Sequence, residues 1–205
     1  PIPEKRLTGW KALIAFIICF VPIFIGFILP IIELCIWTFE VNLEFFNYKF
    51  LINSMNTFAL SITAGVICAA LALLINFSIR FKPSFLIKKF STLLSIGYAV
   101  PGLILAVGMV QLLVYLDSLV LSKFNLILTG SLFGLLLAYI IKTFALANSS
   151  IESAYERISH SLDDSSKLLG STSWNMLSRV HIPLLKTGIL TSVLLVMSDV
   201  VKELP

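Results

Sequence analysis

The sequence is short of charged side chains, which make up 13% of its 205 residues. Soluble domains carry about a quarter charged residues, so the composition argues against a soluble globular protein. Four runs contain no Asp, Glu, Lys, Arg or His at all: residues 12–32, 51–79, 90–116 and 124–141. About 20 helical residues cross a hydrocarbon core of about 30 Å. These runs predict four membrane-spanning helices, and a fifth apolar run at 184–201, interrupted by Lys186 and Asp199, predicts another.

The sequence also lacks the patterns of the common catalytic and metal sites. It contains no GxxxxGK[ST] phosphate loop, no GxSxG motif and no HExxH motif. The three cysteines, Cys19, Cys35 and Cys68, show no CxxC or CxxH spacing and are interpreted as small hydrophobic side chains. His160 and His181 are isolated in the sequence. We therefore expect no enzyme activity in this chain, no cofactor and no metal site.

The charges that remain are divided unevenly among the connections between the apolar runs. Eleven Lys and Arg side chains stand before residue 12, in 80–89 and in 142–182, against two in the alternate connections. The eleven are Lys5, Arg6, Lys11, Arg80, Lys82, Lys88, Lys89, Lys142, Arg157, Lys167 and Arg179; the two are Lys49 and Lys123. Loops rich in Lys and Arg stay in the cytoplasm. We therefore predict that the N-terminus, 80–89 and 142–182 are cytoplasmic, and we do not take the net charge of +4 as a sign of nucleic-acid binding.

These patterns predict an all-α integral membrane protein with a bundle of about five transmembrane helices. Residues 1–50 would hold the first helix and a short outer loop, and residues 51–205 would form the main membrane domain. Because the chain begins with Pro and stops at KELP inside its fifth apolar run, we expect it to be a fragment of a longer polypeptide. The many small residues of 57–79 predict close packing of the second helix.

Pro101 and Gly102 stand in the middle of the third apolar run. Proline removes a backbone donor and disfavours helical geometry at the residue before it, so a break in the helix is expected here. A break at this depth is tolerated where protein or a water-filled cavity covers the freed carbonyls. A kink that only serves packing is the alternative, and both interpretations remain open.

The longest polar stretch is DDSSKLLGSTSWNMLSRVHIPLL, Asp163–Leu185, between the fourth and fifth runs. Residues 152–170 predict a helix, with Ser161 and Asp164 at capping-box spacing for its second part. Gly170 would end that helix as a left-handed C-cap residue.

The hydroxyl residues that follow Gly170 predict the cap of a second, short helix. Trp174, Leu177 and Val180 recur at a spacing of three and would form one apolar face, and Pro183 stands at the entry to the fifth run. The segment is predicted to be a helix–turn–helix elbow outside the membrane. The four acidic residues of 152–164 argue against a helix lying on an anionic bilayer surface; they are Glu152, Glu156, Asp163 and Asp164.

This layout resembles the cytoplasmic loop of ABC-importer permeases, whose consensus is Glu-Ala-Ala, three residues, Gly, nine residues, then Ile-x-Leu-Pro. Here Asp164, Ser165 and Ser166 stand at the triplet, Gly170 at the glycine and HIPLL at the end. Asp thus replaces Glu, Ser replaces both Ala, and the terminal order is Ile-Pro-Leu. The stretches GYAVPGLILAVGMV and LLVMSDVVKELP, and the opening RLTGWKALIAFIICFVPIFIGFILPIIEL, are similar to those of ferric-iron-type permeases, in which two six-helix halves are fused.

The resemblance implies a permease subunit in the bacterial inner membrane, with ATP hydrolysis in a separate subunit. Expected partners are a cytoplasmic dimer of ATP-binding subunits, an extracytoplasmic substrate-binding protein, a second permease half in the same polypeptide, and membrane lipid, but no nucleic acid. Residues 145–183 would form the coupling loop. The residues implied in coupling to the ATPase are Asp164, Ser165, Ser166, Gly170, Trp174, Leu177, Ile182 and Pro183.

The similar stretches favour ferric iron as cargo, with sulfate, molybdate, thiamine or a polyamine as alternatives and an ion channel or secondary transporter as a different class. The candidate translocation path comprises Tyr98, Pro101, Gly102, Asp199 and Glu203. Asp199 lies about 24 Å along the helix from Pro183, and Lys202 and Glu203 share its face. Two hypotheses remain for these charges: an internal Asp199–Lys202 ion pair, or carboxylates that line the outer mouth of the path and attract a hard cation.

Overall fold

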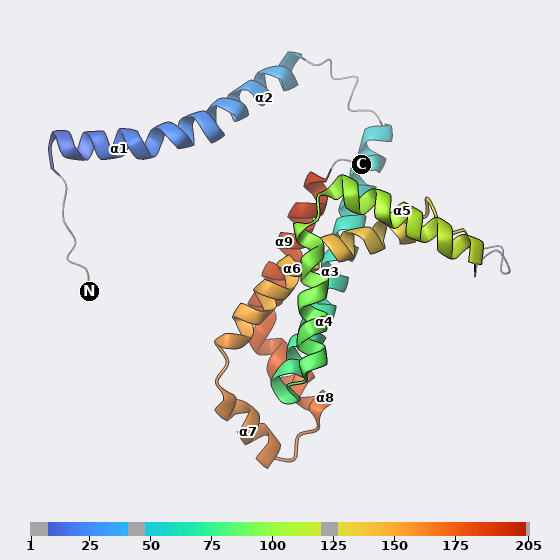
Figure 1. Ribbon diagram of the computed structural model, residues 1–205. Coiled ribbons are helices and arrows are strands. Elements are labelled where there is room, and N and C mark those ends of the chain that lie inside the picture. Colours follow the sequence, from blue (N-terminus) through green and yellow to red (C-terminus); the bar gives the residue numbers. More distant parts are fainter. Residues whose placement is uncertain (1–7, 41–47, 120–126, 204–205) are drawn as a thin grey trace. The chain divides into compact units, whose positions relative to one another are not determined.

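The computed structural model describes residues 8–40, 48–119 and 127–203, which contain helices and no strand (Figure 1). The chain divides into two compact units, Pro1–Asn53 and Ser54–Pro205. The predicted all-α membrane fold is confirmed, because five helices are long and apolar enough to cross a membrane. They are Trp10–Glu40, Tyr48–Phe81, Gly102–Leu119, Leu132–Glu156 and Ser173–Lys202. Most of the predicted outer loop, and the N-terminal residues Lys5 and Arg6, lie outside the described residues.

The first unit contains one continuous helix made of α1 (Trp10–Ile23), the π-helical turn η1 (Phe24–Ile28) and α2 (Leu29–Glu40). It includes and extends the span predicted at 12–32. Pro30 has no backbone N–H to donate four residues back, and the amide before it donates to the carbonyl of Phe24, five residues back. None of the residues of this helix is buried. An apolar helix exposed on all sides is typical of a membrane span.

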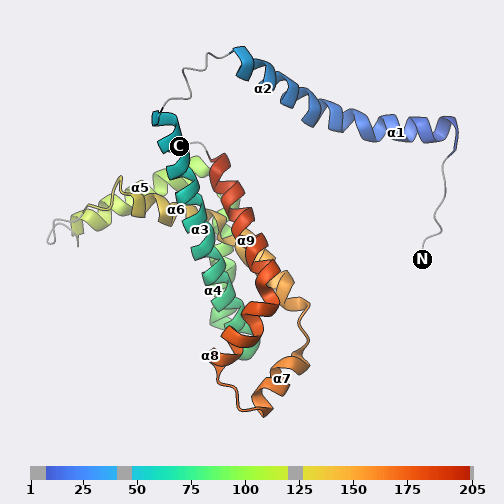
Figure 2. The same cartoon turned by 180° about the vertical axis from the view of Figure 1, so that it is seen from behind.

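The second unit is built on α3 (Tyr48–Phe81, in this unit from Ser54 onward), α6 (Leu132–Glu156) and α9 (Ile182–Lys202). Figures 1 and 2 show α6 and α9 side by side, and their contact is the most extensive in the unit. Many residues at the centre are small and nearly inaccessible: Ala64, Cys68, Ala69, Ala72 and Ala147. A Cβ on Gly65 would stand 2.9 Å from the carbonyl oxygen of Val193. The close packing predicted from the small residues of 57–79 is therefore confirmed.

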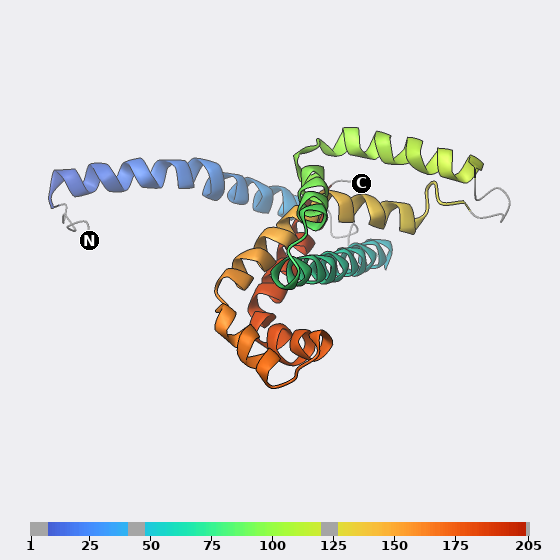
Figure 3. The same ribbon diagram turned by 60° about the horizontal axis from the view of Figure 1, so that its bottom comes forward.

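The helix predicted over 90–116 is two helices. The first part consists of α4 (Phe85–Ile96) and the 3-10 turn η3 (Gly97–Ala99), and it ends at Val100, whose backbone is extended with φ −81° and ψ 128°. The second part is α5 (Gly102–Leu119), which runs in a different direction from α4 (Figures 1 and 3). The break predicted at Pro101 is confirmed, since the residue before proline avoids the helical region. The prediction of a single membrane span over 90–116 was wrong. The part before the break, α4, has 12 residues and is only about 18 Å long, which is shorter than the hydrocarbon core of about 30 Å.

The polar connection predicted at 142–182 is shorter than expected, because α6 continues to Glu156. Lys142, which was counted among the loop charges, therefore lies inside a candidate span. The helix predicted over 152–170 is interrupted between α6 and α7 (His160–Leu168).

The start of α7 also differs from the prediction. Its N-cap is Ser159, whose side chain makes no capping hydrogen bond. The capping box predicted for Ser161 and Asp164 was wrong, because α7 begins before Ser161 and the Ser161 hydroxyl lies 2.9 Å from that of Ser159.

Candidate functional site

Residues 157–181, here called the elbow, connect α6 to α9 through α7 and the short helix α8 (Ser173–Met176), as Figure 3 shows. The chain reverses at Gly170, whose φ is +75°. The Gly170 amide donates to the carbonyl of Lys167 (2.9 Å), and the Ser171 amide donates to that of Ser166 (3.1 Å). This pair of bonds is the Schellman pattern, which closes a helix through a left-handed residue. The predicted role of Gly170 as a C-cap is therefore confirmed.

The return from the turn is also closed by hydrogen bonds. The Thr172 hydroxyl accepts a hydrogen bond from the Asn175 amide at 3.3 Å and caps α8. The cap predicted from the hydroxyl residues after Gly170 is therefore confirmed. After α8 the π-helical turn η5 (Leu177–His181) leads into α9, and the Ile182 amide donates to the Leu177 carbonyl, five residues back. Pro183 follows directly. The same arrangement precedes Pro30, so in both places a single residue separates a π-turn from a proline, which cannot donate.

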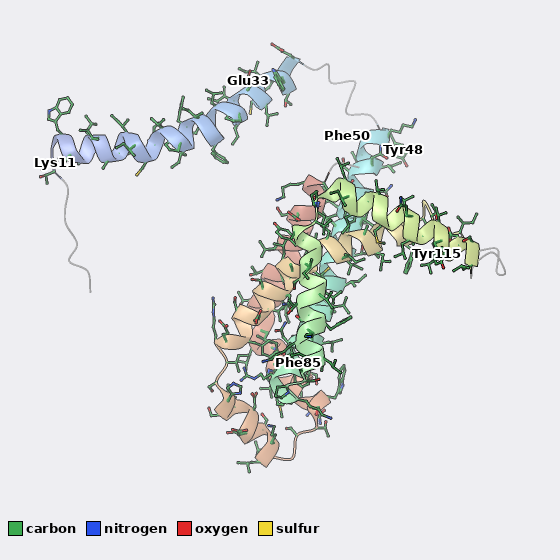
Figure 4. The ribbon with its side chains drawn as sticks, in the orientation of Figure 1. Lys11, Glu33, Tyr48, Phe50, Phe85 and Tyr115 are labelled. Carbon is green, nitrogen blue, oxygen red and sulfur yellow. The ribbon has the colours of Figure 1, made fainter. Side chains whose placement is uncertain are left out.

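The outer side of the elbow presents large apolar side chains. Leu168 is 89% exposed, Leu169 is 86% exposed and Trp174 is 69% exposed. These three residues, here called the elbow patch, flank the turn at Gly170 on both sides; Figure 4 draws the side chains on the ribbon. Of the predicted coupling residues, Asp164, Ser165, Gly170, Trp174, Ile182 and Pro183 are exposed, and Ser166 and Leu177 are buried.

The prediction of a single apolar face on the second helix of the elbow was wrong. Trp174, Leu177 and Val180 do not share an environment, because Leu177 is only 4% exposed while Trp174 projects outward. Trp174 and Leu177 are joined by α8, where residues three apart point about 60° away from each other, and this angle is enough to place one on the exposed side of the elbow and the other on its buried side. Leu168 and Leu169 were not among the predicted coupling residues, although an apolar pair just before a C-cap glycine was visible in the sequence.

The inner side of the elbow contains a buried polar cluster around Arg80, which lies in the last turn of α3. Its Nε donates to Asp163 Oδ2 of α7 at 2.6 Å. Its terminal nitrogens donate to three carbonyl oxygens near the end of α6: Tyr155 (3.0 Å), Ile158 (2.8 Å) and Ser159 (3.1 Å). The side chains of Arg80 and Asp163 are only 8% and 4% exposed. The guanidinium thus neutralises a buried carboxylate and satisfies carbonyls that a helix end leaves unpaired.

His181 completes this cluster and is not isolated, as its position in the sequence had suggested. It is fully buried, and its Nε2 lies 3.1 Å from Asp163 Oδ1. Although these two atoms are close, neither satisfies the geometry of a hydrogen bond with a described protein atom. The rings of Phe77 and Phe81 meet the imidazole edge-on, each with a centroid distance of 5.5 Å.

A second polar site lies beside the break before α5. Lys142 of α6 and Glu203, which follows α9, form an ion pair, and their side chains are 15% and 30% exposed. Gly102 faces this pair so closely that a Cβ would stand 2.8 Å from Lys142 Nζ. A cavity of about 580 Å³ adjoins the three residues, and its lining also includes Tyr139 and Lys202.

Two of the five predicted path residues, Gly102 and Glu203, are thus brought together. Tyr98 and Pro101 do not line this cavity. Asp199 Oδ1 lies 3.1 Å from Lys202 Nζ, which is the contact expected of an internal ion pair. Lys142 was missed as a site residue because its position at the end of an apolar run made it look like a loop charge.

The elbow and the broken helix both lie in a stretch that is similar to a known family. The family described as "Binding-protein-dependent transport system inner membrane component" has a model that matches residues 61–204. The chain belongs to this family. No curated protein and no solved structure matched it.

Family membership confirms the resemblance to ABC-importer permeases that the elbow had indicated. The chain is a multi-pass inner-membrane permease component, and its family works with ATP-binding subunits and a substrate-binding protein. The five candidate spans agree with such a role.

Proposed function

We propose that this permease component forms half of the translocation path of an ATP-driven ferric-iron importer and docks an ATP-binding subunit through its elbow. The observation that carries the docking proposal is the elbow patch. Three large apolar side chains project from a turn closed by hydrogen bonds on both sides. A short, stiff, apolar helix is the kind of element that a partner can hold in a groove.

Asp164 gives the docking surface a charge as well as an apolar patch. Its side chain is 71% exposed, and its contact with Lys167 is long at 3.8 Å. An exposed carboxylate with so weak a contact can accept a stronger bond from an Arg or Lys of a partner. In this proposal the ATP-binding subunits face the cytoplasmic side, where 80–89 and the elbow carry most of the basic residues of the loops.

The path is proposed to run past the second polar site. Three of its residues come from the two stretches similar to ferric-iron-type permeases, since Gly102 lies in GYAVPGLILAVGMV and Lys202 and Glu203 lie in LLVMSDVVKELP. A helix interrupted at membrane depth next to ionisable groups is typical of a substrate pathway. Among residues 8–40, 48–119 and 127–203, no three His, Cys, Asp or Glu side chains gather as a metal site would need. Ferric iron would therefore find further ligands in the second permease half.

One observation favours a second candidate cargo, an oxyanion such as sulfate or molybdate. Two lysines, Lys142 and Lys202, line the cavity with a single carboxylate, Glu203. Glu203 is already paired with Lys142, which leaves little negative charge to attract a cation.

Uptake by the complete transporter tests the cargo. The full-length permease, its ATP-binding subunits and its binding protein would be reconstituted in liposomes and offered radiolabelled ferric iron, sulfate or molybdate with ATP inside. ATP-dependent uptake of iron alone supports the proposal. If an oxyanion is taken up and iron is not, the second candidate cargo replaces iron. If uptake does not depend on ATP, the proposal of an ATP-driven importer is contradicted.

Copurification tests the docking surface. Asp164→Lys should reduce the amount of ATP-binding subunit that copurifies with the permease. Glu152→Lys makes the same charge change at an exposed position of α6 outside the elbow and should copurify normally. Equal loss in both variants, or none in either, would contradict docking through the elbow.

Orientation is tested by labelling single cysteines in intact cells with an impermeant reagent. The basic connections predict labelling at position 45, which lies outside the described residues, and none at 85 or 160. Labelling at 85 or 160 without labelling at 45 would overturn the orientation and place the elbow on the wrong side for the ATP-binding subunits.

A further inference from the structure

The side chain of Arg80 binds residues that are far from it in the sequence. It stands in the last turn of α3, yet its four described hydrogen-bond acceptors all lie 75 to 83 positions away, around the junction of α6 and α7. Three of the bonds reach main-chain carbonyls and one reaches Asp163. The planar fork of an Arg holds several acceptors in fixed directions, so the end of α3 and the start of the elbow are fixed against each other.

Other side chains at the end of α3 make the same connection. Phe77 and Phe81 pack their rings against His181, in the turn that leads to α9. Lys167 of α7 lies over the Phe81 ring, with its Nζ 5.2 Å from the centroid. The last turn of α3 therefore contacts both α7 and the π-turn η5.

Both covalent connections of the elbow depart from a regular α-helix. Toward α6 the helix is interrupted between Glu156 and His160, and toward α9 it passes through the π-turn Leu177–His181. Interrupted helices and π-turns are the usual places where helices bend. Without the bonds of Arg80, a displacement of the elbow would be absorbed at both of these junctions.

The geometry points to Arg80 and Asp163 as a positioning pair that joins the elbow rigidly to α3, so that α3 moves with the elbow when the ATP-binding subunits close. The pair bridges the interruption between α6 and α7, since Arg80 bonds carbonyls of Tyr155, Ile158 and Ser159. The inference rests on the proposed docking of the elbow. It adds a route for the movement, through α3, beside the two irregular junctions of the elbow.

Distance measurements on the assembled transporter test the route. Spin labels at Lys82, directly after α3, and at Ser161, on the exposed side of α7, would report whether the two elements move together. We expect the same mean distance without nucleotide and with ATP and vanadate. In Arg80→Met we expect the distance to change between these states. A changing distance in the otherwise unaltered transporter, or an unchanged one in Arg80→Met, overturns the inference.

Coupling gives a second measurement that a merely structural role would not change. The stimulation of ATP hydrolysis by the loaded binding protein would be measured per assembled transporter. Arg80→Met should lower it about tenfold, within the roughly 5–150-fold range of coupling between sites. Arg80→Lys keeps the charge without the fork and should fall in between. Arg179→Met removes an exposed cation from the same elbow and should match the unaltered transporter.

The outcomes separate this inference from the proposed function. If Arg80→Met only lowers the amount of assembled transporter, and each assembled copy responds normally, Arg80 is structural and the inference fails alone. If the unaltered permease binds no ATP-binding subunit, the proposed docking fails and the inference fails with it. A loss of stimulation confined to the Arg80 variants supports both.

Discussion

The two polar sites of the second unit lie toward opposite ends of α9 and differ in how their charges are held. At the elbow, Arg80 and Asp163 are 8% and 4% exposed, and Arg80 makes four hydrogen bonds. At the other end, Lys142 and Glu203 are 15% and 30% exposed, and in the pair Lys202 and Asp199 the lysine is 70% exposed. The paired side chains are thus buried at the elbow end of α9 and more exposed at its other end.

This difference indicates which charges can change partners. A buried pair that loses one member leaves an uncompensated charge, so it is expensive to break. An exposed pair can exchange its partner for water at little cost. The cluster at the elbow therefore holds elements together, and we propose that the pairs beside the cavity lie where a cargo competes for the same groups.

The largest effect expected from this comparison is that of Arg80→Met. It leaves Asp163 buried beside His181 without a cation and should lower the free energy of unfolding by about 3–5 kcal/mol. Thermal unfolding of the purified permease in detergent measures the loss. Adding Asp163→Asn should recover part of it, because the lone carboxylate is removed. A loss below that of an exposed control such as Arg179→Met would show that the cluster is no more than a surface pair.

Gly170→Val should have the next largest effect. The space around Gly170 is open, with no atom within 4 Å of the point where a Cβ would stand, so the cost arises from φ +75° alone. Holding a β-branched residue there costs about 1–3 kcal/mol, and we expect the turn to reorganise and transport to stall. Gly170→Asn is the matched control, because Asn tolerates the left-handed region. Normal ATP-driven uptake by Gly170→Val would show that the elbow does not depend on this reversal.

The features of the two sites were not equally predictable from the sequence. The spans, the break at Pro101 and the reversal at Gly170 were predicted, because charge-free runs, proline and a C-cap glycine are local signals. Arg80 and Asp163 are 83 positions apart, and nothing near either residue indicates its partner. Asp163 was passed over in favour of its neighbour Asp164, since only the fold decides which of two adjacent carboxylates points inward.

The misplacement of Lys142 has a different cause. A lysine at the end of an apolar run is normally the first residue of a loop, and inside a candidate membrane span its charge is costly unless it is paired, as Lys142 is with Glu203. Similarly, the spacing of Trp174, Leu177 and Val180 did not reveal that Trp174 is exposed and Leu177 is buried. Periodicity indicates which residues lie near one another on a helix, but only packing decides where its buried side ends.

Glu203→Gln should have an intermediate effect, between those of the buried and exposed pairs. It leaves Lys142, which is 15% exposed, to find water in the adjoining cavity, and should cost about 1 kcal/mol. Unfolding in detergent measures this cost, and Lys142→Met in the same chain should restore most of it. If the double variant is no more stable than Glu203→Gln, the two residues do not act as a pair.

The smallest effect on stability is expected from Asp199→Asn. Lys202 is 70% exposed and lies three positions away on the same helix, so the pair should contribute only about 0.3–0.5 kcal/mol. If Asp199 serves this pair alone, uptake should stay normal, and Lys202→Met should abolish the small loss of stability. If the carboxylate serves the cargo, uptake should fall in a fully folded protein and Lys202→Met should not restore it. Uptake measured beside unfolding therefore decides between the two roles, and normal uptake in Asp199→Asn combined with Glu203→Gln would remove both carboxylates from the path.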